Sequence, residues 1–221
     1  MIINQYFKRI VLALLMIVLV SIGNALTLKA SIGVAPWNAM NQEISAITGL
    51  KIGTVGMYAN ILCVIIQLFI LKKNFKFKHL LQVFLSLMLG YTLNFFYYNV
   101  LSGFIINDYI IRVIVLILGY TIIAFTVAII MLIDVVTYPI ESACNAISNK
   151  TGIKFSLLRQ GVDVISIAVA IILWLVFNTP LQVREGTVIG MVIFAPIIDF
   201  FIKRMSPILI KYGVISEASI K

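Results

Sequence analysis

Two polar residues occupy equivalent positions in two short stretches of the sequence. Asn38 follows Pro36 by two residues, and Glu141 follows Pro139 by two residues. Proline is favoured in the first turn of a helix, because an N–H there has no partner within the helix and its loss costs no hydrogen bond. Side chains in that turn lie beside free backbone N–H groups and the positive end of the helix dipole. Pro36, Asn38, Pro139 and Glu141 are therefore candidate substrate-binding residues, and helix capping is the alternative role of Asn38 and Glu141.

Two aspartates lie inside apolar stretches. An ionisable group costs ~2.5–3.5 kcal/mol or more at the centre of a membrane helix, so Asp163 is a candidate site residue and Asp199 a secondary one. Asp163 stands four residues after Arg159, and Asp199 stands four residues before Lys203. Residues at this spacing share a helix face, so an ion pair is the interpretation we favour for Asp163 and Arg159, and Arg159 is itself a secondary candidate. For Asp199, near the cytoplasmic end, snorkelling and pairing with Lys203 are the simpler interpretation.

Motifs for enzymatic chemistry are missing from the sequence. There is no HExxH, GxSxG or Walker A motif, and one histidine, His79, cannot supply a metal cluster. Cys63 and Cys144 form no CxxC motif and are expected to be free buried thiols. We therefore expect no enzyme, no cofactor and no metal site.

Composition points to a membrane protein. Of 221 residues, 62% are hydrophobic and 11% charged, against roughly 45–50% and about 25% in soluble domains. Runs near the ~20 residues that span a bilayer recur along the whole chain. Six spans are predicted, at residues 6–27, 53–71, 80–100, 110–133, 155–177 and 187–202. We expect an all-α integral membrane protein with short loops and tails only.

The distribution of Lys and Arg predicts the topology. With a cytoplasmic N-terminus, thirteen of the 17 basic residues fall in the tails and cytoplasmic loops, and four fall on the other face, namely Lys29, Lys51, Arg112 and Arg184. This positive-inside asymmetry requires both termini in the cytoplasm. The net charge of +9 is explained in this way and does not predict nucleic-acid binding.

An internal repeat is visible when the sequence is shifted by 103 residues. The shift superimposes APWNAMNQEISAITGLKIG on YPIESACNAISNKTGIKFS without a gap, and it places the candidate Asn60 on Asp163. Two extra residues in the second half then place Asn94, a secondary candidate, on Asp199; both asparagines could instead bond between helices. Three spans in each repeat, an odd number, predict inverted topology within one domain: repeat 1 at 1–103, repeat 2 at 104–213 and a tail at 214–221.

Each repeat contains a stretch of helical character that is too short to span, at 36–48 and at 139–151. Helices of this length are re-entrant or interfacial. Trp37 and Tyr138 border the two stretches and are interpreted as aromatic anchors at opposite membrane faces. The first span imitates a signal peptide, but its repeat partner at 110–133 is a clear span, so we expect it to be retained.

The segment GVAPWNAM at 33–40, the segment TGLKIGTV at 48–55 and their echoes in the second half resemble the bacterial YczE/YyaS/YitT family of integral membrane proteins. The resemblance covers most of the chain. The family's first motif usually reads GVAPWD, so Asn38 stands where Asp is usual. Its second motif resembles GPRDGLM, which places its Arg on Ile140 and its Asp on Glu141. The resemblance implies a membrane architecture and a bacterial inner-membrane location.

Discontinuous helices that meet at a repeat interface are where secondary transporters bind their substrates. The sequence therefore favours a small-solute secondary transporter with its site at the repeat interface. The alternative is a non-transporting subunit, either a substrate-binding component or a regulator of a partner protein. The expected partners are the lipid bilayer, an unknown small molecule, and either a second copy of the chain or another membrane protein.

Overall fold

The long helices form wherever the sequence is continuously apolar. The computed structural model describes residues 2–135 and 137–215, and this part of the chain is helical with no strand. Its α-helices are α1 (Ile2–Ala30), α2 (Pro36–Thr48), α3 (Ile52–Leu71), α4 (Phe77–Phe95), α5 (Tyr109–Ile133), α6 (Pro139–Thr151), α7 (Phe155–Phe177) and α8 (Glu185–Lys211). All except α2 and α6 are long and apolar enough to cross a membrane.

The predicted segments agree closely with these helices. The two short helices have the predicted bounds because proline opens each one and a left-handed glycine closes it, with φ of 71° at Gly49 and 75° at Gly152. The clearest difference is α8, which continues nine residues beyond the predicted end at Ile202. Hydropathy falls at Lys203, but a charged residue does not interrupt the helical hydrogen bonds.

The C-terminal ends of α2 and α6 match bond for bond. Ser45 Oγ donates to Leu50 O at 2.6 Å, and Ser148 Oγ donates to Ile153 O at 2.7 Å. The hydroxyls of the two threonines that end these helices bond back into the last turn in the same way. The residues that align under the 103-residue shift thus also form the same local structure at the ends of α2 and α6.

This match gives a first prediction. Ser45→Ala and Ser148→Ala each remove one hydroxyl that satisfies a carbonyl beyond a helix end, so each should lower stability by about 1 kcal/mol. The two losses should be similar, measured as a fall in melting temperature of the purified protein in detergent. A large loss in one variant beside no change in the other would contradict the equivalence of the two ends.

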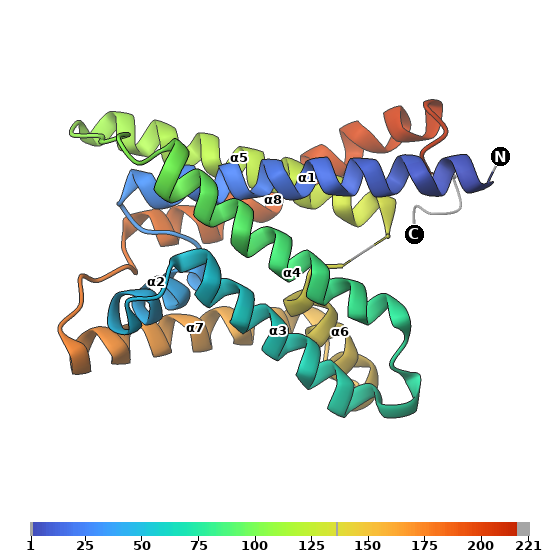
Figure 1. The fold of residues 1–221 in the computed structure, drawn as a ribbon, viewed down its shortest axis with the longest axis horizontal. Coiled ribbons are helices and arrows are strands. Elements are labelled where there is room, and N and C mark those ends of the chain that lie inside the picture. The colour runs from blue at the N-terminus through green and yellow to red at the C-terminus, as the bar shows by residue number, and fades with distance from the viewer. Residues whose placement is uncertain (1, 136, 216–221) are drawn as a thin grey trace.

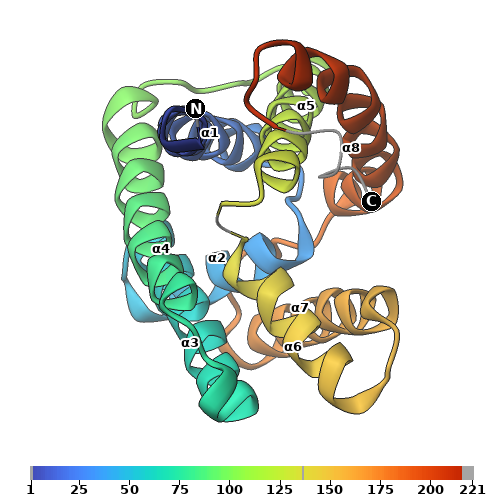
Figure 2. The same cartoon turned by 90° about the vertical axis from the view of Figure 1, so that its right-hand side faces the viewer.

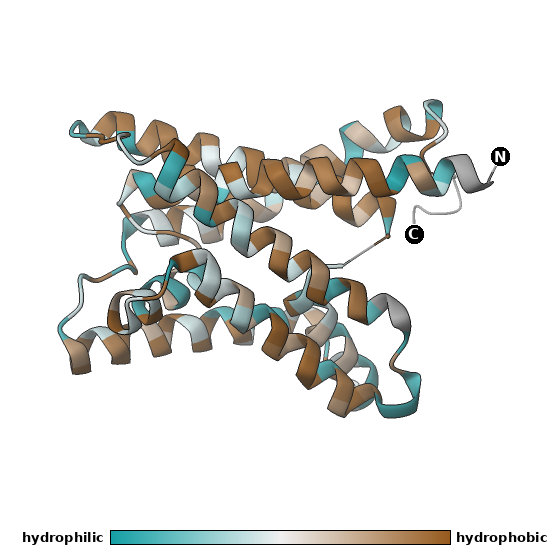
Figure 3. Cartoon of the chain, viewed as in Figure 1, coloured by the Kyte–Doolittle hydropathy of each residue, from teal (hydrophilic) through white to brown (hydrophobic). Residues whose placement is uncertain are grey.

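Helices at corresponding positions run in opposite directions. Figure 1 shows this for α1 and α5, for α3 and α7, and for α4 and α8. The start of α1 and the end of α8 lie together at one end of the molecule. Hydrophobic residues cover the long helices, and hydrophilic residues gather mainly toward the ends of the molecule (Figure 3). Many large apolar side chains face outward, as expected of helices in contact with lipid.

The core is centred on α1 and α5, which pack together along their lengths, with α4 against α1 and α8 against α5. The short helices are exchanged between the halves of the chain, since α2 packs against α7 and α6 packs against α3. Figure 2 shows both short helices between the α1–α5 pair and helices α3 and α7. Each short helix is therefore packed largely against the other half of the chain.

Candidate functional site

An ionic cluster lies beside the first turn of α6. Arg159 Nη1 donates to Asp163 Oδ1 at 2.6 Å, and Arg159 Nε lies 3.4 Å from Glu141 Oε1. The pairing of Arg159 with Asp163 four residues apart is as predicted. The pairing with Glu141 is new, and it joins three predicted site residues into one cluster.

The charges of this cluster do not balance. Two carboxylates share one guanidinium, and the shorter contact goes to Asp163. Glu141 Oε2 is buried and has no hydrogen-bond partner among the described residues, and the same is true of Tyr138 Oη close by in sequence. With both carboxyl groups ionised, the cluster carries a net charge of −1 and an unpaired acceptor, and in that state it is suited to a ligand that donates hydrogen bonds.

Gln67 of α3 holds the start of α6 in place. Its Nε2 donates to Pro139 O at 3.1 Å and to Gln82 Oε1 at 2.9 Å, and its Oε1 accepts from Ser142 Oγ at 2.8 Å. Gln67 is fully buried. Sequence reasoning missed it because one glutamine in an apolar span has no partner visible in the sequence, although its polarity at that depth was a usable signal.

The first turn of α2 contacts the inner part of α1. Asn38 Nδ2 donates to Asn24 Oδ1 at 2.7 Å. Asn24 lies six residues before the end of α1, or about 9 Å along the helix axis. On the other side, Cys63 packs against Ile140 eight residues before the end of α3, or about 12 Å from it. Both first turns thus lie beside the inner parts of the long helices, about 9–12 Å from the helix ends.

Glu43 in the middle of α2 is the second residue that the sequence did not reveal. Its side chain is fully buried. Thr179 Oγ1 donates to its Oε2 at 2.5 Å, and Gln182 N donates to its Oε1 at 3.0 Å. Both donors belong to the segment 178–184 that joins α7 to α8. Glu43 falls in a polar stretch of the sequence, where a carboxylate does not predict burial.

Trp37 connects the two first turns. It packs against the cluster of Cys63, Ile140 and Ala143. Trp37 is partly buried and the Tyr138 hydroxyl is buried, and the role of these two rings as anchors at the membrane surface stays a prediction. In the described residues Asn38 and Glu141 share no hydrogen bond, and Trp37 of α2 packs against the cluster that includes Ile140 and Ala143 of α6.

The remaining predicted residues lie apart from this region. Asn94 bonds between helices as predicted, accepting from Gly53 N at 2.9 Å and donating to Thr54 Oγ1 at 3.0 Å. Asn60 is partly buried, and no side-chain bond of Asn60 is found in the described residues. Asp199 is exposed on α8, and residues 2–135 and 137–215 contain no ion pair between it and Lys203. That predicted pair is wrong; both side chains are exposed.

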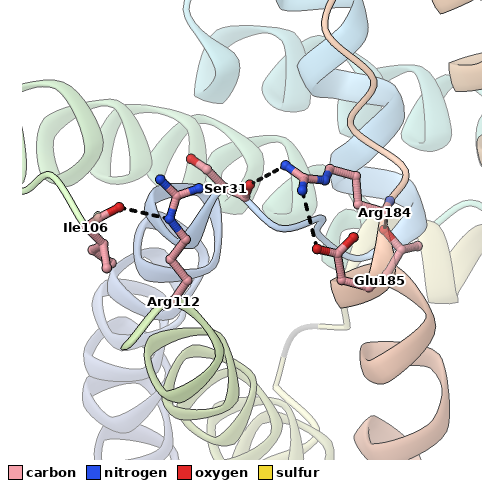
Figure 4. A network of polar contacts seen from close by, with 6 residues as sticks. Ser31, Ile106, Arg112, Arg184 and Glu185 are labelled. Carbon is pink, nitrogen blue, oxygen red and sulfur yellow. Dashed lines mark hydrogen bonds and ion pairs between the residues drawn. The ribbon is translucent and has the colours of Figure 1, made fainter. Parts of the chain in front are cut away.

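The end of the molecule where α1 ends carries the four basic residues predicted to lie outside the cytoplasm. Arg184 Nη1 donates to Ser31 O at 2.9 Å, and Arg112 Nε donates to Ile106 O at 2.8 Å (Figure 4). Lys29 and Lys51 lie over the rings of Tyr97 and Tyr98. Each of these cations therefore has a structural partner, so they do not form a free cationic site.

Cys63 and Cys144 are free and buried, as predicted. No group of metal-binding side chains is found among the residues described. No curated protein and no solved structure matches this chain. A family model matches residues 7–203, so the chain belongs to the family of unknown function DUF6198.

Proposed function

We propose that this chain is a small-solute secondary transporter whose substrate site lies between the first turns of α2 and α6. The observation that carries the proposal is the charge imbalance beside Glu141, at a place where two short helices begin below the ends of the long ones. Free N–H groups at the start of a helix, an unpaired carboxylate oxygen and an adjacent arginine can bind a polar solute inside a membrane.

Inverted repeats and re-entrant helices are part of the same proposal. Four observations support them: the matching ends of α2 and α6, the opposite directions of corresponding helices, the exchanged packing of the short helices, and the depth of the first turns. In this architecture one repeat moves against the other around a central site. The chain is a multi-pass membrane protein, and we propose the bacterial inner membrane with both termini in the cytoplasm. We also propose that DUF6198 shares this architecture with the YczE/YyaS/YitT family.

The proposal is tested by a thermal-shift screen of the purified protein against amino acids, vitamins, nucleobases, metal ions and lipid head groups. A ligand at 100 times its Kd should stabilise the folded state by ~2.7 kcal/mol. We expect the shift to disappear in Glu141→Gln and to weaken in Asn38→Ala. Asp199→Asn is the matched control, because it removes one carboxylate from an exposed position remote from the site.

Uptake into liposomes then separates the two functions that the sequence leaves open. A ligand that shifts the melting temperature and accumulates in liposomes containing this chain alone supports the transporter. Binding without uptake, together with a stoichiometric partner on purification, would overturn it in favour of a substrate-binding subunit. If no compound shifts the wild type while all variants remain folded, the proposed site is wrong.

A further inference from the structure

Glu43 is a buried carboxylate without a counter-charge. No ion pair of Glu43 is found in the described part of the chain, and its two oxygens are satisfied only by Thr179 Oγ1 and the Gln182 backbone N–H. Burying a charge in this way is costly. Two opposing contributions to the free energy therefore act on the contact between Glu43 and the segment. The two hydrogen bonds keep the segment 178–184 on α2, and hydration of the carboxylate favours its release.

The same segment also covers apolar residues of α2. Val183 packs against the cluster of Leu28, Val34, Ala39 and Ile52. Ala39 is fully buried there, and it lies one helical turn before Glu43, on the same face. Release of the segment from Glu43 would therefore loosen the packing of Val183 on the cluster that contains Ala39.

The far end of the segment is fastened separately. Arg184 donates to Ser31 O, and Gly186 N donates to Ile32 O at 2.7 Å. Figure 4 shows Arg184 reaching from the start of α8 to Ser31 at the end of α1. The segment can therefore detach at Thr179 and Gln182 while it stays attached at Arg184, so it can open as a loop about that fixed end.

A neutral counterpart holds the other short helix. There Gln67 joins α3 to the start of α6, with Gln82 and Ser142 as partners. Both contacts join a short helix of one half of the chain to the other half. Only the Glu43 contact includes a charge, so only that contact gains hydration of an ion on opening.

We propose that segment 178–184 is the gate at the non-cytoplasmic end of the transport site, held closed by Glu43, and that Gln67 fixes the other end. This inference rests on the proposed transport function and adds which end opens.

The gate is tested by labelling a buried reporter cysteine. Ala39→Cys is introduced together with Cys63→Ser and Cys144→Ser, and a membrane-impermeant maleimide is added to intact cells or to inverted vesicles. Thr179→Val removes one hydrogen bond to Glu43 by a change in segment 178–184. Glu43→Ala removes both hydrogen bonds by a change in α2. Gln182→Ala is the matched control, because it keeps the backbone N–H and removes only a partly buried side chain that bonds to Pro180 O.

In intact cells, Thr179→Val and Glu43→Ala should each raise the labelling rate about tenfold or more over the reporter alone, because Thr179→Val removes one of the two hydrogen bonds that hold the segment and Glu43→Ala removes both. Gln182→Ala should leave the rate unchanged, as should Gln67→Leu. Equal rates in all variants, or faster labelling only in inverted vesicles, would overturn the gate. Gel filtration of each variant identifies misfolded protein, and Thr179→Val keeps the test valid if Glu43→Ala fails to fold.

Failure of the gate and failure of the proposed function are distinguishable, because labelling needs no substrate. A ligand that binds and accumulates while the labelling rates stay equal would refute the gate and leave the transporter standing. Faster labelling in the two variants supports the gate whether or not the compound screen finds a ligand.

Discussion

Gly53→Ala should unfold this protein or separate α3 from α4. The two helices approach so closely that a Cβ on Gly53 would lie 2.3 Å from Gly90 O and 2.7 Å from Asn94 Oδ1. A backbone oxygen cannot move aside as a flexible side chain can, so the helices must move apart and the bond from Gly53 N to Asn94 is lost with them. Overpacking costs about 1–3 kcal/mol and occasionally more, and we expect the upper end here.

Gly56→Ala is the matched control for this prediction. Gly56 lies one turn further along α3, and a Cβ there would meet its nearest neighbour, Asn41 Nδ2, at an ordinary 3.6 Å. The measurement is the yield of monodisperse protein on gel filtration and its melting temperature. If Gly53→Ala were as stable as Gly56→Ala, the close contact of α3 and α4 would be wrong. Gly90→Ala is a second test of the same contact from the α4 side.

Arg159→Gln should destabilise the protein through charge. It leaves Glu141 and Asp163 close together without their shared cation. Breaking a buried pair costs about 3–5 kcal/mol, and since the three side chains are 22–35% exposed in the absence of lipid, we expect about 2 kcal/mol. The effect is measured as a fall in melting temperature.

Removing the charges that remain should reverse much of this loss. Arg159→Gln combined with Glu141→Gln and Asp163→Asn has no uncompensated charge, so it should melt above Arg159→Gln alone. A triple variant less stable than the single one would show that Arg159 acts through packing, and the charge imbalance proposed for the site would lose its support. Lys203→Gln on α8 removes one cation without breaking a pair and should have little effect.

The short helices were predictable because their limits are local. Pro36 and Gly49 set one helix, Pro139 and Gly152 set the other, and neither needs a distant residue to define its bounds. The ionic bond of Arg159 with Asp163 was predictable for the same reason, since a separation of four residues fixes it on one helix face.

The rest of the site depends on contacts between distant parts of the chain. Asp199 and Lys203 have the same spacing as Arg159 and Asp163, yet these two exposed side chains of α8 do not pair. Glu43 looks like a surface residue until a segment more than a hundred positions later covers it. Its equivalent in the second repeat is Ala146, so the internal repeat also gave no signal.

Because α2 packs against the second half of the chain, these contacts can form only after that half has been synthesised. Gln182, which supplies one of the bonds to Glu43, follows it by 139 residues. At a synthesis rate of 5–20 residues per second, that interval lasts roughly 7–28 s. During this time the Glu43 carboxylate lacks its final partners, so α2 has to stay near water, or beside a chaperone or the insertion machinery, until segment 178–184 has been synthesised. The buried position of Glu43 is therefore acquired late, after most of the chain is already in the membrane.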